Sequence, residues 1–383
     1  MQSSQPPAIA LYHAHNIEEC PWPQTDDGQY AQASLTPMIK QGVSQYIDNI
    51  QTSMSVLKIG DVVLPITIND AEYANSYVCS PYSFYISYAR ESLDVISRAW
   101  LTSLMDFVLV GLGKFFKQFH INKVITVNNW LYSTNLYPQI APKQLDMGIA
   151  YLKERYPDHA IIFRSIDQMT SPVCYETFKQ MPCSIIATRQ VFLIDPHATT
   201  LMNSRLFKSD LKLLKNSGYE IVNNGRLTEA DIPRLLYLYR DLYIHKYSDL
   251  NPKFNENFLR LVLKENLLNF RALKKDGRLD GVVGYVVRNG KMYCPFFGYD
   301  GEVPKEPSLY RLLSTVLMQE AIDNRLFFHQ SSGASVFKTI RKAERHIEYT
   351  AVFYDHLKVR RHIPWILLKS LYNSIGTHYM KKY

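Results

Sequence analysis

The sequence predicts a mixed α/β fold with two lobes, each a mixed central sheet flanked by helices. Residues 293–354 read in order as an apolar run, a helix, a second apolar run, a short helix and a third apolar run. Residues 123–195 repeat this order at the same spacing with negligible sequence identity. A chain of 383 residues also suits two domains better than one. We therefore expect two copies of one α/β unit.

The domain boundaries follow from this repeat and from local composition. Residues 1–40 are rich in Pro, Gln and Ser and read as an N-terminal extension. The first lobe is expected at residues 41–195 and the second at 196–355. Residues 356–383 form a basic amphipathic C-terminal tail, since they hold six Lys or Arg residues and no acidic one.

Charge and cysteine usage limit the class of protein. The formal charge is +8, and subtracting the tail's +6 leaves only +2 for the rest. Because a nucleic-acid surface spreads its charge along one face, we expect no DNA partner. The five cysteines are scattered and never form a C-x-x-C pair. We expect free thiols, no metal site and, with no signal peptide, a cytoplasmic location.

The first lobe begins with a predicted helix at residues 38–51 and a hairpin at 56–70. Tyr77, Tyr82, Tyr85 and Tyr88 either line a pocket or pack together. The long apolar stretch 99–116 carries two charged residues and is short for a membrane span, so it predicts a buried helix.

The second lobe shows clearer signals. Thr228 is a predicted N-cap, and Asp276-Gly277 and Asn289-Gly290 predict hairpin turns within an antiparallel meander. Residues 308–323 have apolar positions three and four apart, which indicates an amphipathic helix. The strands before and after this helix should be parallel, with a right-handed crossover.

Ligands of open α/β sheets bind beyond the carboxyl ends of the parallel strands. The polar residues at that edge are the first candidates for function. They are Tyr299, Asp300, His329, Ser331 and Ser332.

Several motif readings fail. G-x-G-K at residues 111–114 is followed by Phe115, whereas a phosphate loop needs Ser or Thr there and a longer spacing. The chain has no G-x-S-x-G, no H-E-x-x-H and no dinucleotide fingerprint. Hydrolase, metalloprotease and dehydrogenase functions therefore lose their main support.

Residues 206–354 resemble the GNAT acyltransferase superfamily, and within it the tandem-domain branch that includes the FemABX peptidyltransferases. The resemblance is carried by LTEADIPRLLYLYRDLY, by the meander from Asp276 to Asp300, by SLYRLLSTVLMQEAIDNRLFFHQSSG and by the closing EYTAVFYD. It rests on the order of elements more than on an invariant signature.

The resemblance implies a donor site between two parallel strands that splay apart. The acyl arm would lie along Phe297, Gly298 and Tyr299, where a backbone N–H could stabilise an oxyanion. The donor's phosphates would sit at the helix N-terminus formed by Ser308, Leu309 and Tyr310. It implies no permanently bound cofactor, with acyl-CoA or an acyl carrier protein as co-substrate.

One departure from the family pattern concerns the donor. Coenzyme-A-dependent members carry a Gln/Arg-x-x-Gly-x-Gly/Ala turn before that helix, and this chain has GEVPKEPS. Pro304 and Pro307 cannot donate a hydrogen bond, and Glu302 and Glu306 repel phosphate. An acyl carrier protein or an aminoacyl-tRNA donor thus stays open beside coenzyme A.

The candidate catalytic residues are His329 as base, Asp300, and Tyr349, near which the superfamily often has an acid. Glu302 could share the base role or hold an amine, and Ser331 and Ser332 could hold a carboxylate. Each has a structural alternative: His329 as a hydrogen-bonded strand residue, the acids as solvated loop residues, and the serines as the end of a strand.

The sequence therefore predicts an N-acyltransferase that moves an acyl group from a thioester to a small-molecule amine or amino acid. The alternatives are a catalytically silent GNAT-fold scaffold and a FemABX-like transferase dependent on aminoacyl-tRNA. The tail could contact an anionic membrane or an acidic carrier protein, or it could pack on the first lobe.

Overall fold

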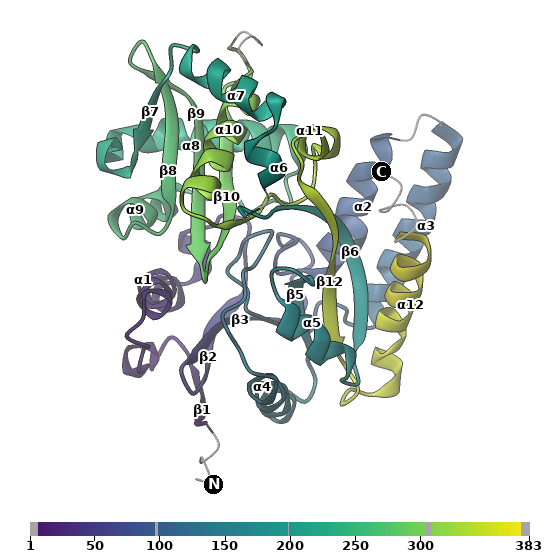
Figure 1. Ribbon diagram of the computed structural model, residues 1–383. Helices are drawn as coiled ribbons and strands as arrows, with labels where there is room; N and C mark the ends of the chain where they lie inside the picture. Colours follow the sequence, from purple (N-terminus) through teal and green to yellow (C-terminus); the bar gives the residue numbers. More distant parts are fainter. Residues whose placement is uncertain (1–6, 96–98, 198, 304–307, 377–383) are drawn as a thin grey trace. The chain divides into compact units, whose positions relative to one another are not determined.

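The computed structural model describes residues 7–95, 99–197, 199–303 and 308–376, which form two compact units. The first unit holds the described residues up to Thr188, Leu250–Pro252 and the described residues from Tyr349 on. The second unit holds Arg189–Asp249 and Lys253–Glu348. Both are mixed α/β structures with helices against a sheet (Figure 1), which confirms the predicted fold class.

The sheet of the first unit contains one parallel pair, β4 with β5, among antiparallel neighbours. The strand order is β1, β2, β3, β4, β5, β12. The bounds are β1 (Ile9–Tyr12), β2 (Ser53–Ile59), β3 (Val62–Asn69), β4 (Val124–Val127), β5 (Ala160–Ile166) and β12 (Glu344–Phe353), the last entering this unit at Tyr349. The predicted hairpin at residues 56–70 corresponds to β2 and β3.

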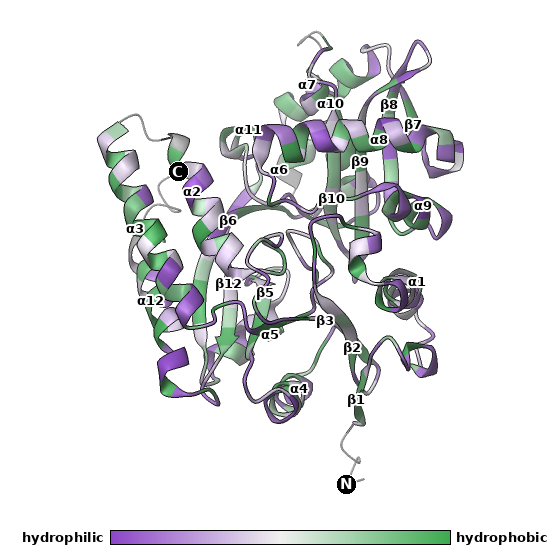
Figure 2. Ribbon diagram, turned by 180° about the vertical axis from the view of Figure 1, so that it is seen from behind, coloured by the Kyte–Doolittle hydropathy of each residue, from purple (hydrophilic) through white to green (hydrophobic). Residues whose placement is uncertain are grey.

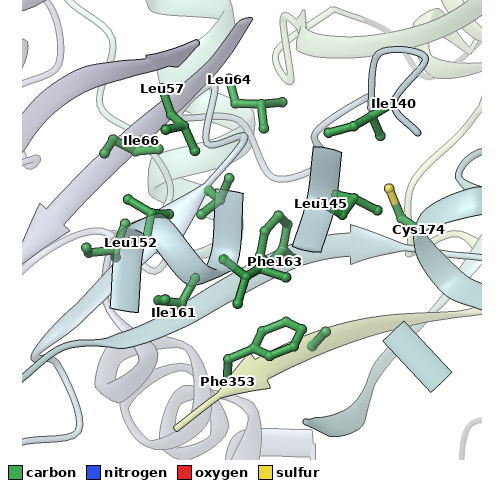
Figure 3. Packing of buried hydrophobic residues seen from close by; sticks show 14 of the residues in the cluster. Leu57, Leu64, Ile66, Ile140, Leu145, Leu152, Ile161, Phe163, Cys174 and Phe353 are labelled. Atoms are coloured by element: carbon green, nitrogen blue, oxygen red, sulfur yellow. The ribbon is translucent and has the colours of Figure 1, made fainter. Parts of the chain in front are cut away.

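Helices cover both faces of this sheet. Those of the first unit are α1 (Asp26–Gln41), α2 (Tyr88–Glu91), α3 (Ala99–Gln118), α4 (Pro142–Arg155), α5 (Pro172–Lys179) and α12 (Ile363–Leu371). On one face, Leu145 and Leu152 of α4 and Cys174 of α5 pack against Phe163 and Phe353 (Figure 3). On the other face, α3 and α12 contribute to a separate apolar cluster.

The sheet of the second unit has the order β6, β11, β10, β9, β8, β7. Only β10 and β11 are parallel, and the other described pairs are antiparallel. The bounds are β6 (Ser184–Ile194), β7 (Glu220–Asn223), β8 (Asn269–Lys275), β9 (Arg278–Arg288), β10 (Lys291–Tyr299) and β11 (Phe327–His329). Asp276-Gly277 and Asn289-Gly290 have positive φ angles, as expected for the two predicted hairpin turns.

Helices lie on both faces of this second sheet as well. Their bounds are α6 (Thr199–Met202), α7 (Arg205–Lys215), α8 (Ile232–Arg240), α9 (Glu256–Lys264), α10 (Leu309–Asp323) and α11 (Ser335–Ile340). Leu312 and Met318 of α10 pack with Phe207 of α7 and Met292 of β10. Thr228, the predicted N-cap, forms a capping box with Asp231.

The predicted repeat is present at the level of elements. β4-α4-β5-α5-β6 and β10-α10-β11-α11-β12 have the same order. The closing strand of each copy pairs in the other unit: β6 pairs with β11 through Phe328 opposite Ile194, and β12 pairs with β5 through Tyr349 opposite Ile166. The repeat therefore includes an exchange of strands.

Two predictions for the N-terminal part were wrong. The helix is α1, which begins twelve residues before the predicted start, because Thr25 caps it by accepting a hydrogen bond from the N–H of Gly28. It ends where Gly42 adopts a φ of 90°. Ala31 and Leu35 of this helix are buried, so the described residues of 7–40 are part of the first unit rather than an extension.

The prediction of a buried helix at residues 99–116 was also wrong. α3 forms, and its length and apolar composition would suffice to cross a membrane, but most of it is exposed. Only Gly113 and Phe116 among its described residues are buried. Apolar composition predicts the helix, but it does not tell whether other elements cover it.

The structure shows the surroundings of three of these tyrosines and of part of the tail. Tyr77 and Tyr85 line a small pocket in the first unit, whereas Tyr82 packs edge-on against Tyr73. In the tail, Trp365 and Leu368 of α12 pack into the first unit. Residues 377–383 lie outside the described part of the chain.

Candidate active site

The second unit contains two parallel strands that separate partway along their length. β10 and β11 pair at three positions, of which Tyr293 opposite His329 is the last. β11 then ends, whereas β10 continues to Tyr299 with β9 as its partner on the other side. A register shift against β9 between Tyr293 and Phe296 marks a β-bulge, which redirects the strand. In the described chain, residues 294–299 of β10 thus form an open edge.

The direction of the amides along this open edge follows from one hydrogen bond. The N–H of Asp300 donates to the carbonyl of Asp280, at 2.8 Å, and so points toward β9. Because N–H groups alternate in direction along a strand, those of Phe297 and Tyr299 point the other way. Two backbone donors therefore face the open edge, where they could stabilise a negatively charged oxygen.

The opposite face of β10 is held by α8. A Cβ atom built on Gly298 would lie 2.5 Å from the carbonyl carbon of Leu238, so only glycine fits this approach. The ring of Tyr239 stacks on Phe296 with centroids 4.7 Å apart. These contacts fix the position of the strand that carries the open edge.

Aromatic rings line the face of β10 that carries Phe297 and Tyr299. Tyr310 lies 5.5 Å from Phe297 and 6.4 Å from Tyr299, measured between ring centroids. Phe337 of α11 lies 4.9 Å from Tyr310. Burial raises the pKa of Tyr310 to about 12, so its hydroxyl stays protonated at neutral pH. The amides at the open edge thus lie next to an apolar wall.

The N-terminus of α10 carries positive charge. Ser308 is its N-cap residue, and the Ser308 hydroxyl makes no capping hydrogen bond. Arg311, in the first turn, binds the fully buried carboxylate of Asp210 at 2.5 Å, and Arg341 binds the same carboxylate at 2.7 Å. Two guanidinium groups on one carboxylate leave one net positive charge beside the helix dipole.

His329 is buried, and both of its ring nitrogens face protein groups. Nδ1 accepts a hydrogen bond from the N–H of Ser331 at 3.1 Å. Nε2 lies 3.8 Å from Glu348, whose carboxylate also binds Arg189 at 2.8 Å. This arrangement fixes the end of β11, as expected for the structural alternative, and the predicted base role stays a prediction.

Asp300 follows β10 directly and is also buried. Its carboxylate binds Arg234 at 2.6 Å and accepts the N–H of Glu302 at 2.8 Å. Burial alone would raise the pKa of Asp300, but the bonds from Arg234 and Glu302 outweigh it and lower the pKa. The group is therefore a paired carboxylate, which is a poor base. Glu302 is exposed.

Ser331 and Ser332 belong to a backbone segment that binds a buried lysine, Lys338, which the sequence analysis did not single out. Lys338 donates to the carbonyls of Gln330 at 2.7 Å and of Ser332 at 2.8 Å. Burial lowers the pKa of Lys338 to about 7, and the carbonyls act against this shift because they favour the ammonium form. Ser331 has a φ of 59°, so the turn is a strained backbone segment around the lysine.

Tyr349 belongs to the first unit, where its ring lies 5.4 Å from Tyr175. The other candidates all lie in the second unit, at the end of β10, at the start of α10 or at the end of β11. Pro304 and Pro307, in the segment that differs from the coenzyme-A-binding pattern of the family, lie outside the described residues. Sequence reasoning missed Lys338, Asp210 and Arg341, since no local pattern marks a helix residue as buried and paired.

Comparison with known proteins supports the assignment of the second unit. Residues 208–348 match the family model described as an acetyltransferase (GNAT) domain. No curated protein matches the chain.

The solved structures that match this chain are distant in sequence. L-PGS from Bacillus licheniformis is 14% identical, with a TM-score of 0.44 over 60% of this chain and 77% of that one. FemX is 9% identical, with a TM-score of 0.43 over 61% and 79%. A tandem GNAT protein from the clavulanic acid biosynthesis pathway is 10% identical, with a TM-score of 0.38 over 90% and 98%.

Proposed function

Since this chain carries a GNAT domain at residues 208–348 and so belongs to the GNAT superfamily, we propose that it is an N-acyltransferase. It takes an acyl group from a thioester donor and transfers it to an amine. The observation that carries the proposal is the open edge of β10 beyond Tyr293. There the acyl arm can lie along the strand, with its carbonyl oxygen at the N–H of Phe297 or Tyr299.

The phosphate of the donor belongs at the start of α10. The first N–H groups of α10 have no partner within the helix. Arg311 and Arg341, which share the carboxylate of Asp210, add a net positive charge there. Pro304 and Pro307, which precede α10 in the sequence, have no backbone N–H to donate. A donor with a single phosphate, such as acylated carrier protein, needs fewer of these donors than the pyrophosphate of coenzyme A.

The chemistry can proceed without a strong protein base or acid. The neutral acceptor amine attacks the thioester carbon, the C–N bond forms, and the C–S bond breaks with its electron pair staying on sulfur. The leaving thiolate then takes up the proton that the nitrogen loses, which gives an amide and a free thiol. An α-amino group with a pKa of about 7.7–8.0 is partly neutral at pH 8, and a thiol with a pKa of about 8.5 is a good leaving group. The protein would therefore contribute mainly orientation and oxyanion stabilisation.

A thermal-shift series tests the choice of donor. We expect acylated carrier protein or an acyl-CoA to raise the unfolding temperature, because a ligand that binds only the folded state stabilises it. Arg311→Gln should weaken this shift, since it removes a partly exposed charge and leaves Arg341 on Asp210. Arg260→Gln, on the surface of α9, is the matched control. Aminoacyl-tRNA is included as a further donor.

A catalytically silent binding protein is the second candidate. It is favoured by the contacts of His329 and Asp300, since both are engaged within the protein. If no thioester and no aminoacyl-tRNA shifts the unfolding temperature, the transferase proposal fails and the silent candidate stands.

A further inference from the structure

α3 exposes a continuous apolar face. Trp100 is 65% exposed, Leu104 51% and Phe107 77%. The spacing of four and then three residues places them on one side of the helix. Gly111 and Lys114 continue the same line, so the apolar face ends in a lysine. Figure 2 shows green, apolar segments along α3. Contact of these apolar side chains with water does not stabilise the fold of the first unit, so the face is a candidate interaction surface.

The other side of the helix is anchored in the first unit. Phe116 is buried in the cluster that contains Trp365 of α12. A Cβ atom on Gly113 would lie 2.9 Å from the hydroxyl of Tyr82, so the helix packs closely there. Asp106 is paired with Arg90 of α2 at 2.6 Å. An anchored helix with one apolar face suits an element that lies along a surface better than one that crosses a bilayer.

The charge around this face is positive. α12 lies beside α3 in both views of the first unit (Figures 1 and 2), and the two helices share a core cluster. α12 exposes Ile366 and Lys369. The preceding segment exposes Lys358 and Arg360, and the sequence has no acidic residue from His356 on. Lysines and arginines near a membrane attract anionic lipids.

We propose that the exposed face of α3, together with the basic residues of α12, binds the surface of an anionic lipid membrane. Trp100 would lie at the headgroup level and Leu104 and Phe107 just below it, as amphipathic interfacial helices do. Lys114 would reach back to the phosphates. The proposed membrane contact involves only the first unit and does not depend on the proposed acyl transfer.

Trp100 supplies a direct signal for this binding. The chain has four tryptophans, all in its described part, and the other three, Trp22, Trp130 and Trp365, are buried. We expect the fluorescence of the full chain to shift to shorter wavelength with vesicles of phosphatidylcholine and phosphatidylglycerol. Brominated lipids should quench it, and added salt should weaken the binding. Vesicles of phosphatidylcholine alone should bind less.

Variants separate membrane binding from other uses of the face. Leu104→Gln combined with Phe107→Gln should lower the vesicle partition coefficient about tenfold or more, since burial of such side chains is lost. Val173→Gln, at an exposed apolar position of α5, is the matched control and should bind as the unchanged chain does. Unaltered circular dichroism would show that the double variant still folds.

Three results would overturn the proposal. One is equal partitioning of the double variant and the unchanged chain. Another is an absence of quenching by brominated lipids. The third is a dimer in analytical ultracentrifugation that the double variant converts to a monomer, without vesicle binding, because the face would then be an interface between copies of the chain.

Discussion

Tyr293 and His329 are the last residues at which β10 and β11 face each other. Beyond this pair, β10 carries Phe297 and Tyr299 with their amides directed away from β9. The ring centroids of Tyr293 and His329 lie 6.0 Å apart and nearly perpendicular. This contact marks the end of the pairing between β10 and β11 and the start of the open edge of β10.

Replacing Gly298 by alanine should destabilise the second unit. The added methyl group would overlap the backbone of α8 at Leu238, and overpacking of this kind costs about 1–3 kcal/mol. Chemical denaturation measures the effect. Gly301→Ala is the control, because the nearest atom to its Cβ lies 3.4 Å away on Asp241. Equal stability of the two variants would show that α8 does not hold β10.

Asp210→Asn should reduce the free energy of unfolding by about 3–5 kcal/mol, because a buried ion pair that loses one partner leaves uncompensated charge. The carboxylate is fully buried and binds Arg311 and Arg341. Glu256→Gln breaks an exposed pair with Arg260 and should cost much less. Similar losses of stability in both variants would contradict a structural role for the pairing of Asp210 with Arg311 and Arg341.

His329→Gln should affect stability more than turnover. A buried group that loses a hydrogen-bond partner costs about 1–3 kcal/mol, and here the N–H of Ser331 is affected. With the donor found by thermal shift, we expect kcat to fall less than about tenfold, below the usual contribution of a general base. A loss of about a hundredfold or more, together with the loss of the acidic limb of the pH profile, would establish His329 as the base.

Lys338 should make stability depend on pH. Its folded pKa is lowered to about 7, whereas an unfolded lysine titrates near 10.4. Between these values the unfolded chain binds more protons, so the free energy of unfolding should rise with pH from about 7 to 10. Lys338→Met should remove this rise, and Lys264→Met, at an exposed position, should keep it. No difference between them would mean that the carbonyls of Gln330 and Ser332 hold Lys338 in the ammonium form.

Much of the second unit could be predicted from local pattern. The amphipathic spacing of α10, the two glycine turns of the meander and the parallel β10–β11 pair are all local signals with a physical cause. The resemblance of the second unit to a GNAT domain rests on the order of these elements, and residues 208–348 match the model of that domain.

Other features depend on contacts that local sequence does not specify. The exchange of β6 and β12 is a long-range pairing, and the repeat pattern is the same with or without it. The exposure of α3 depends on whether other elements pack over it, which the residues of the helix do not specify. At the candidate site, the sequence places His329 and Asp300 at the right strand ends, but their pairing with Glu348 and Arg234 becomes visible only in three dimensions.

The central claim is that the open edge of β10 holds the donor's acyl group. A crystal structure with a stable analogue, in which an amide replaces the thioester of the acyl donor, tests it most directly. We predict that the analogue's carbonyl oxygen accepts a hydrogen bond from the backbone N–H of Phe297 or Tyr299, within about 3 Å. A structure in which another strand pairs with these amides, or in which the analogue binds elsewhere, would contradict the claim.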